Sequence, residues 1–254
     1  MSLLEVIALT AADARAAQEG GADRIEVVAD MAADGLTPDP DELAAIRAAT
    51  DLPLRVMLRA NAGFRTTGAE LDRLRHAAAG LAEAGADGFV LGFLDSFGHV
   101  DAAATEKLAA VAAPLPWTFH RALDHAADPA HAWRTVRGFG GGGLDTVLTA
   151  GSARGVDAGV EVLVRRAAEG PDAAALIMAG GGLRRKHVAV LAAPASRRST
   201  SARPSARTAP GTSRSTRRWS PSGARWSPRP RAAEGRRGRT PDVFGAFCPI
   251  RVGS

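Results

Sequence analysis

The stretch EGGADRI, residues 19–25, recurs as EAGADGF at residues 83–89, and a weaker echo, GGLD, stands at residues 142–145. Glycine in such a place supplies the left-handed residue that ends a helix, and the apolar run that follows it is typical of a buried parallel strand. The stretch therefore marks a junction from helix to strand. Its repetition indicates a chain that is built from strand–helix units.

The same alternation extends through the first three-quarters of the chain, where short apolar runs are separated by segments of helical period rich in Ala and Leu. We expect strands at residues 3–9, 24–29, 53–58, 88–94, 117–122, 145–150 and 174–179. We expect helices at residues 11–19, 40–49, 69–84, 102–112, 129–137, 156–168 and 184–192. Seven such units favour an α/β fold of the TIM-type (β/α)8 barrel class over a doubly wound sheet.

The eighth unit of such a barrel is missing or replaced. No leucine follows Leu191, and residues 196–240 consist mostly of Arg, Ser, Pro, Ala, Gly and Thr. A segment of this composition buries too little apolar surface to offset the entropy of ordering its backbone. We therefore expect an incomplete barrel over residues 1–194 and a mostly disordered tail over residues 195–254.

The basic character of the chain belongs to its tail. Residues 1–192 hold 18 basic and 25 acidic side chains, a net charge of −7, whereas residues 193–254 hold 14 Arg and 2 acidic residues, a net charge of +12. A nucleic-acid-binding arm and a solvated linker are two interpretations of the tail. The abrupt loss of leucine inside a strand–helix unit fits a shifted reading frame of a GC-rich gene better. We therefore do not expect a nucleic-acid partner.

The sequence also bears on where the protein works. No apolar run approaches the length of about 18 residues that a membrane span needs, and the first residues lack the basic and apolar regions of a signal peptide. The single cysteine, Cys248, excludes an internal disulfide. These features predict a soluble cytoplasmic protein without a membrane partner.

Polar residues at the carboxyl ends of the expected strands are the candidate site, because TIM barrels place their sites there. Glu26 lies inside the second strand, Arg59 ends the third, and His120 and Arg121 follow the fifth. A buried carboxylate is costly unless it is paired. We therefore expect Glu26 to face the barrel mouth, toward an arginine or a ligand. An ion pair with Arg24 or with another strand's arginine is the alternative.

The stretch WTFHRA, residues 117–122, is the most informative for chemistry. His120 would supply a titratable base, Arg121 would bind an anion, and Asp124 would orient the base. The catalytic candidates are therefore Glu26, His120 and Asp124. A structural histidine with satisfied hydrogen bonds is the alternative for His120.

Two loops after the later strands could hold an anion. Glycines between the seventh strand and a helix let backbone N–H groups approach an anion at the helix N-terminus, and phosphate sites of TIM barrels lie after strands seven and eight. These glycines are Gly180, Gly181 and Gly182. The second candidate loop follows the sixth strand and comprises Thr149, Gly151 and Ser152.

Metal ligands are not evident from spacing. The first 192 residues contain no HxH motif, no HxxxH motif with a carboxylate and no cysteine. A site for a soft metal therefore has no recognisable ligands. We predict no metal-binding residues.

Five motifs, taken in order, resemble those of the CutC family: EGGADRIE (19–26), DGLTP (34–38), WTFHRA (117–122), LTAGS (148–152) and IMAGGG (177–182). The resemblance covers about residues 3–192 and not the C-terminal segment. It implies a cytoplasmic (β/α)8 barrel, often a homodimer, with a role in copper homeostasis and with copper as the implied cofactor. It also implies site residues at the barrel mouth, namely Glu26, Arg59, His120, Arg121, Asp124 and Gly180–Gly182.

The chain departs from this family pattern at positions that matter for copper. Family members commonly carry cysteines at the end of the first strand and after the Arg-Ile-Glu of the second, where this chain has Ile7, Ala8 and Val28. The thiolates that Cu(I) prefers are therefore missing. The family's Arg-Pro-Arg-Gly-Gly after the third strand is replaced by RANAG at residues 59–63.

Three hypotheses follow. The first is a CutC-like protein with a barrel-mouth pocket for a small anionic molecule. The second is an enzyme that uses His120 and Glu26 as acid and base, with Arg59 and Arg121 binding the anion. The third is an inactive, damaged copy, because an open barrel exposes unpaired strand edges.

Overall fold

The computed structural model describes residues 3–139, 142–191 and 250–251. All of them belong to one compact unit of the chain. The predicted boundary at residues 194/195 and most of the predicted tail lie outside the described residues. The expectations about the tail therefore stay predictions.

One sheet of eight strands forms the inside of this unit, and its strands neighbour one another in chain order. Seven strands are parallel: β1 (Glu5–Ala8), β2 (Arg24–Val27), β3 (Leu54–Met57), β4 (Gly88–Leu91), β5 (Trp117–Phe119), β6 (Leu144–Thr149) and β7 (Ile177–Ala179). The eighth, β8 (Ile250–Arg251), pairs antiparallel with β7. The predicted incomplete TIM-type barrel is confirmed, and a short antiparallel segment replaces its eighth strand.

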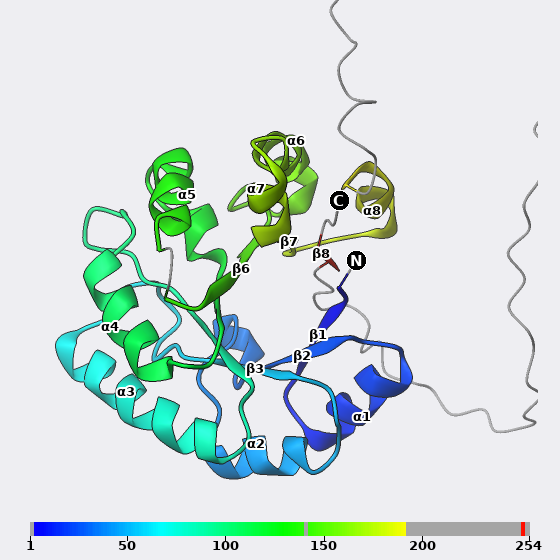
Figure 1. The fold of residues 1–254 in the computed structure, drawn as a ribbon, viewed down its shortest axis with the longest axis vertical. Helices are drawn as coiled ribbons and strands as arrows, with labels where there is room; N and C mark the ends of the chain where they lie inside the picture. Colours follow the sequence, from blue (N-terminus) through cyan, green and yellow to red (C-terminus); the bar gives the residue numbers. More distant parts are fainter. Residues whose placement is uncertain (1–2, 140–141, 192–249, 252–254) are drawn as a thin grey trace, which may run out of the picture. The chain divides into compact units, whose positions relative to one another are not determined.

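The helices lie on the outer side of the curved sheet (Figure 1). They are α1 (Ala11–Glu19), α2 (Pro40–Arg47), α3 (Gly68–Glu83), α4 (Ala102–Ala112), α5 (Pro129–Arg137), α6 (Val156–Ala167), α7 (Pro171–Leu176) and α8 (Arg185–Leu191). Two 3-10 turns, η1 (Met31–Ala33) and η2 (Arg121–His125), follow β2 and β5. Both turns lie at the carboxyl ends of strands, where the predicted site residues gather.

The repeated junction has the structure that its glycines predict. Gly21 and Gly85 adopt positive φ angles of 84° and 107° directly after α1 and α3. The aspartates of the repeat have a role that the sequence did not indicate. Asp23 accepts a hydrogen bond from the Leu4 N–H at 2.8 Å, and Asp87 accepts one from the Leu54 N–H at 2.9 Å. Each aspartate therefore ties its junction to the start of the preceding strand in the sheet.

Three expected strand boundaries are wrong by three residues, and one of them is the end of β4, which lies at Leu91 and not at residue 94. The strand expected at residues 174–179 begins only at Ile177, because α7 occupies Pro171–Leu176. Proline at the first helical position followed by alanines favours a helix. The strand expected at residues 117–122 ends at Phe119, where η2 takes over. Because the strand has ended before Arg121, His120 and Arg121 can both line the pocket described below.

Charged side chains fill the barrel interior near the amino ends of the strands. Arg24 forms an ion pair with Glu5, and Arg55 forms one with Asp145. Glu5, Arg24 and Arg55 are each buried. Burial raises the pKa of Glu5 above its ordinary value, although Arg24 opposes the shift. A layer of ion pairs thus stands where TIM barrels usually place apolar side chains.

Candidate active site at the barrel mouth

A pocket opens at the carboxyl ends of the strands, above the layer of ion pairs. Its lining residues are Ile7, Glu26, Val28, Met31, Asp34, Met57, Arg59, Phe64, His120, Arg121, His125 and Leu148. Four of the predicted site residues, Glu26, Arg59, His120 and Arg121, are among them. The volume of the cavity is about 70 Å³. The pocket therefore suits a small ligand.

Glu26 is a buried carboxyl group without a partner in the described part of the chain. It lies in β2, is 2% exposed, and makes no hydrogen bond or ion pair with any described residue. The ion pair with Arg24 that was one alternative is not formed, because Arg24 binds Glu5 instead. Burial, helped by the charge of Glu5 and opposed by Arg24, raises the pKa of Glu26 to about 8. Glu26 is therefore mostly protonated at neutral pH.

His120 is a buried imidazole with one unused nitrogen. It is 4% exposed, and its Nδ1 accepts a hydrogen bond from the Ala122 N–H at 3.3 Å. This bond assigns the proton of the neutral ring to Nε2, which has no partner among the described residues. Burial, reinforced by the positive charge of Arg59, lowers the pKa of His120 to about 3. His120 is therefore a neutral hydrogen-bond donor at physiological pH.

Arg59 holds the loops that form the pocket rim. Its Nε donates to the Gly63 carbonyl at 3.1 Å, and its Nη1 donates to the Ala33 carbonyl at 2.9 Å. Further bonds reach the carbonyl groups of Asp34, Gly35 and Ala62. Most donors of the guanidinium are thus used by the protein. Its charge still contributes to the pocket, but the structure gives Arg59 mainly a role in fixing the loops.

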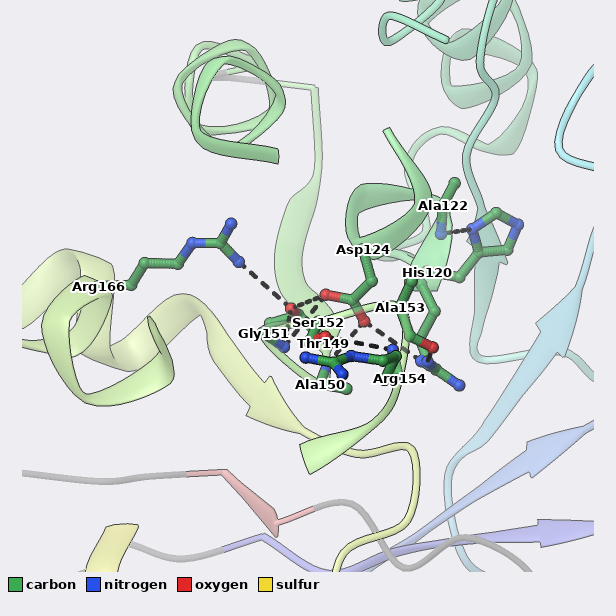
Figure 2. Close-up of polar contacts among 11 residues, drawn as sticks. His120, Ala122, Asp124, Thr149, Ala150, Gly151, Ser152, Ala153, Arg154 and Arg166 are labelled. Atoms are coloured by element: carbon green, nitrogen blue, oxygen red, sulfur yellow. Dashed lines mark hydrogen bonds and ion pairs between the residues drawn. The ribbon is translucent and has the colours of Figure 1, made fainter. Parts of the chain in front are cut away.

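Asp124 does not contact His120. Figure 2 shows that Asp124 instead joins η2 to the end of β6. It accepts hydrogen bonds from the Thr149 hydroxyl at 2.6 Å, the Ala150 N–H at 2.7 Å and the Gly151 N–H at 3.1 Å. The role expected for Asp124, orienting His120, is therefore replaced by a connection between two loops.

Arg121 links this connection to the pocket. Its Nε donates to Asp124 at 3.2 Å, and its Nη2 donates to the Ala153 carbonyl at 3.4 Å. Its Nη1 has no partner in the part of the chain that the structure describes. The side chain is 22% exposed, in contrast to 1% for Asp124. Arg121 therefore lines the pocket and carries an Nη1 group that none of the described residues binds.

The glycine segment after β7 lies outside the pocket lining. The Gly181 carbonyl accepts a hydrogen bond from the Val156 N–H at 2.9 Å, so it caps α6. Gly180 donates its N–H to the Thr149 carbonyl at 3.1 Å, as part of the sheet. The Ser152 hydroxyl accepts a hydrogen bond from the Arg154 N–H at 3.2 Å. The residues predicted to bind an anion after β6 and β7 are therefore not part of the pocket that Glu26 and His120 line. They are Thr149, Gly151, Ser152 and Gly180–Gly182.

Several lining residues were missed by the sequence interpretation. They are Met31 in η1, His125 in η2, Asp34 and Phe64 on loops, Met57 at the end of β3 and Leu148 in β6. The Phe64 ring lies against His120, with ring centroids 5.5 Å apart, and the Arg59 Cζ stands 4.9 Å from its centroid. Asp34 belongs to the DGLTP motif and Leu148 to the LTAGS motif, so these two motifs were the available signals. Arg166 was also missed; its Nη1 lies 3.3 Å from the Thr149 hydroxyl.

Residues 3–139, 142–191 and 250–251 contain no group of three or more His, Cys, Asp or Glu side chains that could hold a metal ion. Within the same residues, every helix is too short or too polar to cross a membrane.

Comparison with known proteins places the chain in a family. The sequence profile of the CutC family matches residues 2–201. A relative from Klebsiella pneumoniae (strain 342), which is named family protein CutC, is 36% identical over 192 residues. These residues are 75% of this chain and 76% of that protein. A family protein CutC of Xanthomonas campestris pv. campestris (strain B100) is 38% identical over 194 residues, 75% of this chain and 78% of that protein.

A solved structure agrees with the fold. The copper homeostasis protein CutC from Streptococcus agalactiae superimposes with a TM-score of 0.59 at 23% identity, over 65% of this chain and 81% of that one. At this identity the likeness bears on the fold alone. With the profile and the sequence relatives, the assignment is clear: the chain belongs to the CutC family.

Proposed function

We propose that the barrel-mouth pocket binds a small organic anion. The observation that carries the proposal is the pair Glu26 and His120. Both are buried, both line the same pocket, and neither the Glu26 carboxyl nor the His120 Nε2 has a partner among the described residues. The buried His120 Nε2 is such an unpaired group, and leaving one unpaired costs roughly 1–3 kcal/mol. A ligand acceptor at Nε2 would recover that free energy, and the same ligand would meet the Glu26 carboxyl in the pocket.

The ligand must bring hydrogen-bond acceptors, because the pocket offers donors. His120 presents Nε2–H, since its Nδ1 already accepts from Ala122. Glu26, with a pKa of about 8, presents its O–H at neutral pH. Arg121, which lines the pocket, adds a positive charge and an Nη1 group that has no partner among the described residues. A carboxylate group matches this set, because charge-assisted hydrogen bonds are about twice as strong as neutral ones.

The remainder of the ligand is expected to be short and apolar. Aliphatic and thioether side chains form much of the wall: Ile7, Val28, Met31, Met57 and Leu148. The two positions at which family members commonly carry cysteine, Ile7 and Val28, are part of this apolar wall. A small aliphatic carboxylate therefore fits the pocket better than a larger or doubly charged molecule.

Catalysis is the second candidate function, and the pKa of Glu26 favours it. A general base works best when its pKa lies near the operating pH, and burial brings the pKa of Glu26 to about 8. The neutral His120 N–H would then stabilise negative charge that develops on the substrate. In this scheme Glu26 alone transfers the proton. His120 would donate a hydrogen bond and would not act as the acid or base that the sequence predicted, because its pKa is about 3.

Copper is the metal that the name of the Streptococcus agalactiae relative implies. The described residues do not fit a Cu(I) site. The pocket contains two thioethers, Met31 and Met57, but no thiolate. His120 cannot offer a lone pair at Nε2 while its Nδ1 accepts the Ala122 N–H. A link to copper homeostasis is thus a proposal from family membership, and we assign copper no role in the pocket.

This assignment gives a testable expectation. A variant with Cys248→Ser should retain no stoichiometric Cu(I) after dialysis against a competing chelator, because the barrel supplies no thiolate. The unmodified protein is the control, since Cys248 is its only thiol. One equivalent of Cu(I) held by the variant would show that the pocket thioethers bind copper after all.

The anion proposal is tested with butyrate and inorganic phosphate by isothermal titration calorimetry. Arg121→Gln should weaken butyrate binding by about tenfold or more, the loss expected for one charge-assisted hydrogen bond. Arg154→Gln is the matched control, because Arg154 is exposed and does not line the pocket. No heat of binding with either anion would contradict the proposal. Equal losses in the two variants would show that only general surface charge matters.

The family resemblance also leads us to propose a cytoplasmic homodimer. Light scattering on a size-exclusion column measures the mass directly. A mass of one chain at micromolar concentration would contradict the dimer.

A further inference from the structure

We infer that Gly181 is a positioning residue for Arg121: the space left by its missing side chain holds the Arg121 guanidinium at the rim of the pocket. The inference rests on the proposed function, because it gives Gly181 a role in anion binding that it performs through Arg121. It differs from the anion cradle that the sequence suggested for Gly180–Gly182, in which backbone N–H groups would bind the anion directly.

The first observation is the close approach of Arg121 to Gly181. A Cβ atom on Gly181 would lie 2.8 Å from both Cζ and Nε of Arg121 and 3.0 Å from its Nη1. Real Cβ contacts are essentially never this short. The guanidinium therefore occupies space that a side chain on residue 181 would fill. Because an arginine side chain is flexible, a larger residue would displace Arg121 and leave the fold in place.

The second observation is that Gly181 itself is fixed. It has a φ angle of 90°, and its carbonyl binds the N–H of Val156 at the start of α6. Gly180, the residue before it, is bound to β6 through the Thr149 carbonyl. The backbone at residue 181 is thus held from two sides and forms a rigid surface for the guanidinium.

The third observation is that the opposite side of Arg121 is held as well. Its Nε binds Asp124, and Asp124 is fixed by the Thr149 hydroxyl, which lies 3.3 Å from Nη1 of the buried Arg166 (Figure 2). Gly181 and Asp124 together leave the guanidinium little freedom. The Nη1 group, which has no partner among the described residues, remains for a ligand. Such preorganisation lowers the entropy lost on binding.

The experiment compares Gly181→Ala with Gly182→Ala. Gly182 has a similar φ angle, 81°, but a Cβ there would meet nothing within 4 Å. Both variants therefore carry the same backbone strain, and only Gly181→Ala moves Arg121. With butyrate as the probe, Gly181→Ala is expected to lower affinity at least fivefold, while Gly182→Ala stays within twofold of the unmodified protein.

A double-variant cycle shows whether Gly181 acts through Arg121. In an Arg121→Gln background, Gly181→Ala should cause no further loss of butyrate affinity, which a general structural defect would still cause. Should Gly181→Ala fail to fold, the pair Gly181→Ala/Arg121→Gln should fold again, because the steric conflict is removed.

The outcomes are distinct. Equal affinities for Gly181→Ala and Gly182→Ala, or the same loss in the Arg121→Gln background, would overturn the inference. No butyrate or phosphate binding by the unmodified protein would instead overturn the proposed function on which it rests.

Discussion

Replacing Arg24 by methionine is expected to destabilise the protein by about 3–5 kcal/mol, the usual result of removing one partner of a buried ion pair. Arg24 is the ion-pair partner of Glu5, and the Glu5 side chain is 1% exposed. Without Arg24 the Glu5 carboxylate would lose the charge that opposes its burial. Urea denaturation at pH 7 measures the loss directly.

The double variant Glu5→Leu/Arg24→Met distinguishes the contribution of the ion pair to stability from the contribution of the packing around it. Well-packed apolar residues often replace a buried ion pair without loss of stability, so the double variant should regain most of the free energy of unfolding. Arg75→Met is the control, because its ion pair with Asp72 is exposed and should contribute less than about 1 kcal/mol. A small effect of Arg24→Met, equal to that of Arg75→Met, would mean that water reaches the barrel interior.

The same measurement bears on the possibility of a damaged, inactive copy. Among the described residues β1 pairs only with β2, so one edge of the sheet has no partner. A chain that had lost its structure together with its eighth unit would melt without cooperativity. A single sharp transition for the unmodified protein would argue against that hypothesis.

The fold could be predicted from the sequence because its signals are local. The glycine that ends each helix and the apolar run after it stand side by side in the chain, as at residues 19–25 and 83–89. The errors in the strand bounds arose where local signals overlap. The alanines before Ile177 are continuous with its apolar run, so the expected strand began at residue 174, although Pro171–Leu176 form α7. No local signal placed β8, because it pairs with β7 from far along the sequence.

The site could be predicted in part. Strand ends predict which residues reach the mouth of a barrel, so Glu26, Arg59, His120 and Arg121 were found together in one pocket. Their hydrogen-bond partners could not be predicted, because partners come from other loops. Asp124 binds the end of β6 instead of His120 for this reason.

Replacing Glu26 by glutamine is expected to stabilise the protein at pH 8 and to leave its stability at pH 5 nearly unchanged. The carboxyl of Glu26 keeps its proton up to a pKa of about 8 in the folded state, against an ordinary value of 4.5. Between these two pH values the folded state binds more protons than the unfolded state. The free energy of unfolding therefore falls as pH rises through this window.

The size of this effect follows from the shift. At about 1.4 kcal/mol per pH unit, Glu26 would lower the free energy of unfolding by at most about 4–5 kcal/mol between pH 4.5 and pH 8. Glutamine has nearly the same shape and stays neutral, so Glu26→Gln removes this contribution. The buried Glu5 adds a slope of the same sign in both proteins. The difference between the two unfolding curves, measured in urea from pH 5 to pH 8, therefore reports Glu26 together with its interaction with Glu5.

Ligand binding should follow the same titration. Above pH 8 an ionised Glu26 would repel a carboxylate and could no longer donate a hydrogen bond, so butyrate affinity should fall in the unmodified protein. Glu26→Gln keeps a donor and should bind butyrate with little change across this range. If stability and affinity both proved independent of pH in the unmodified protein, Glu26 would have to be ionised or solvated in the pocket. The pocket would then offer an anion no protonated carboxyl, and the proposed ligand class would be wrong.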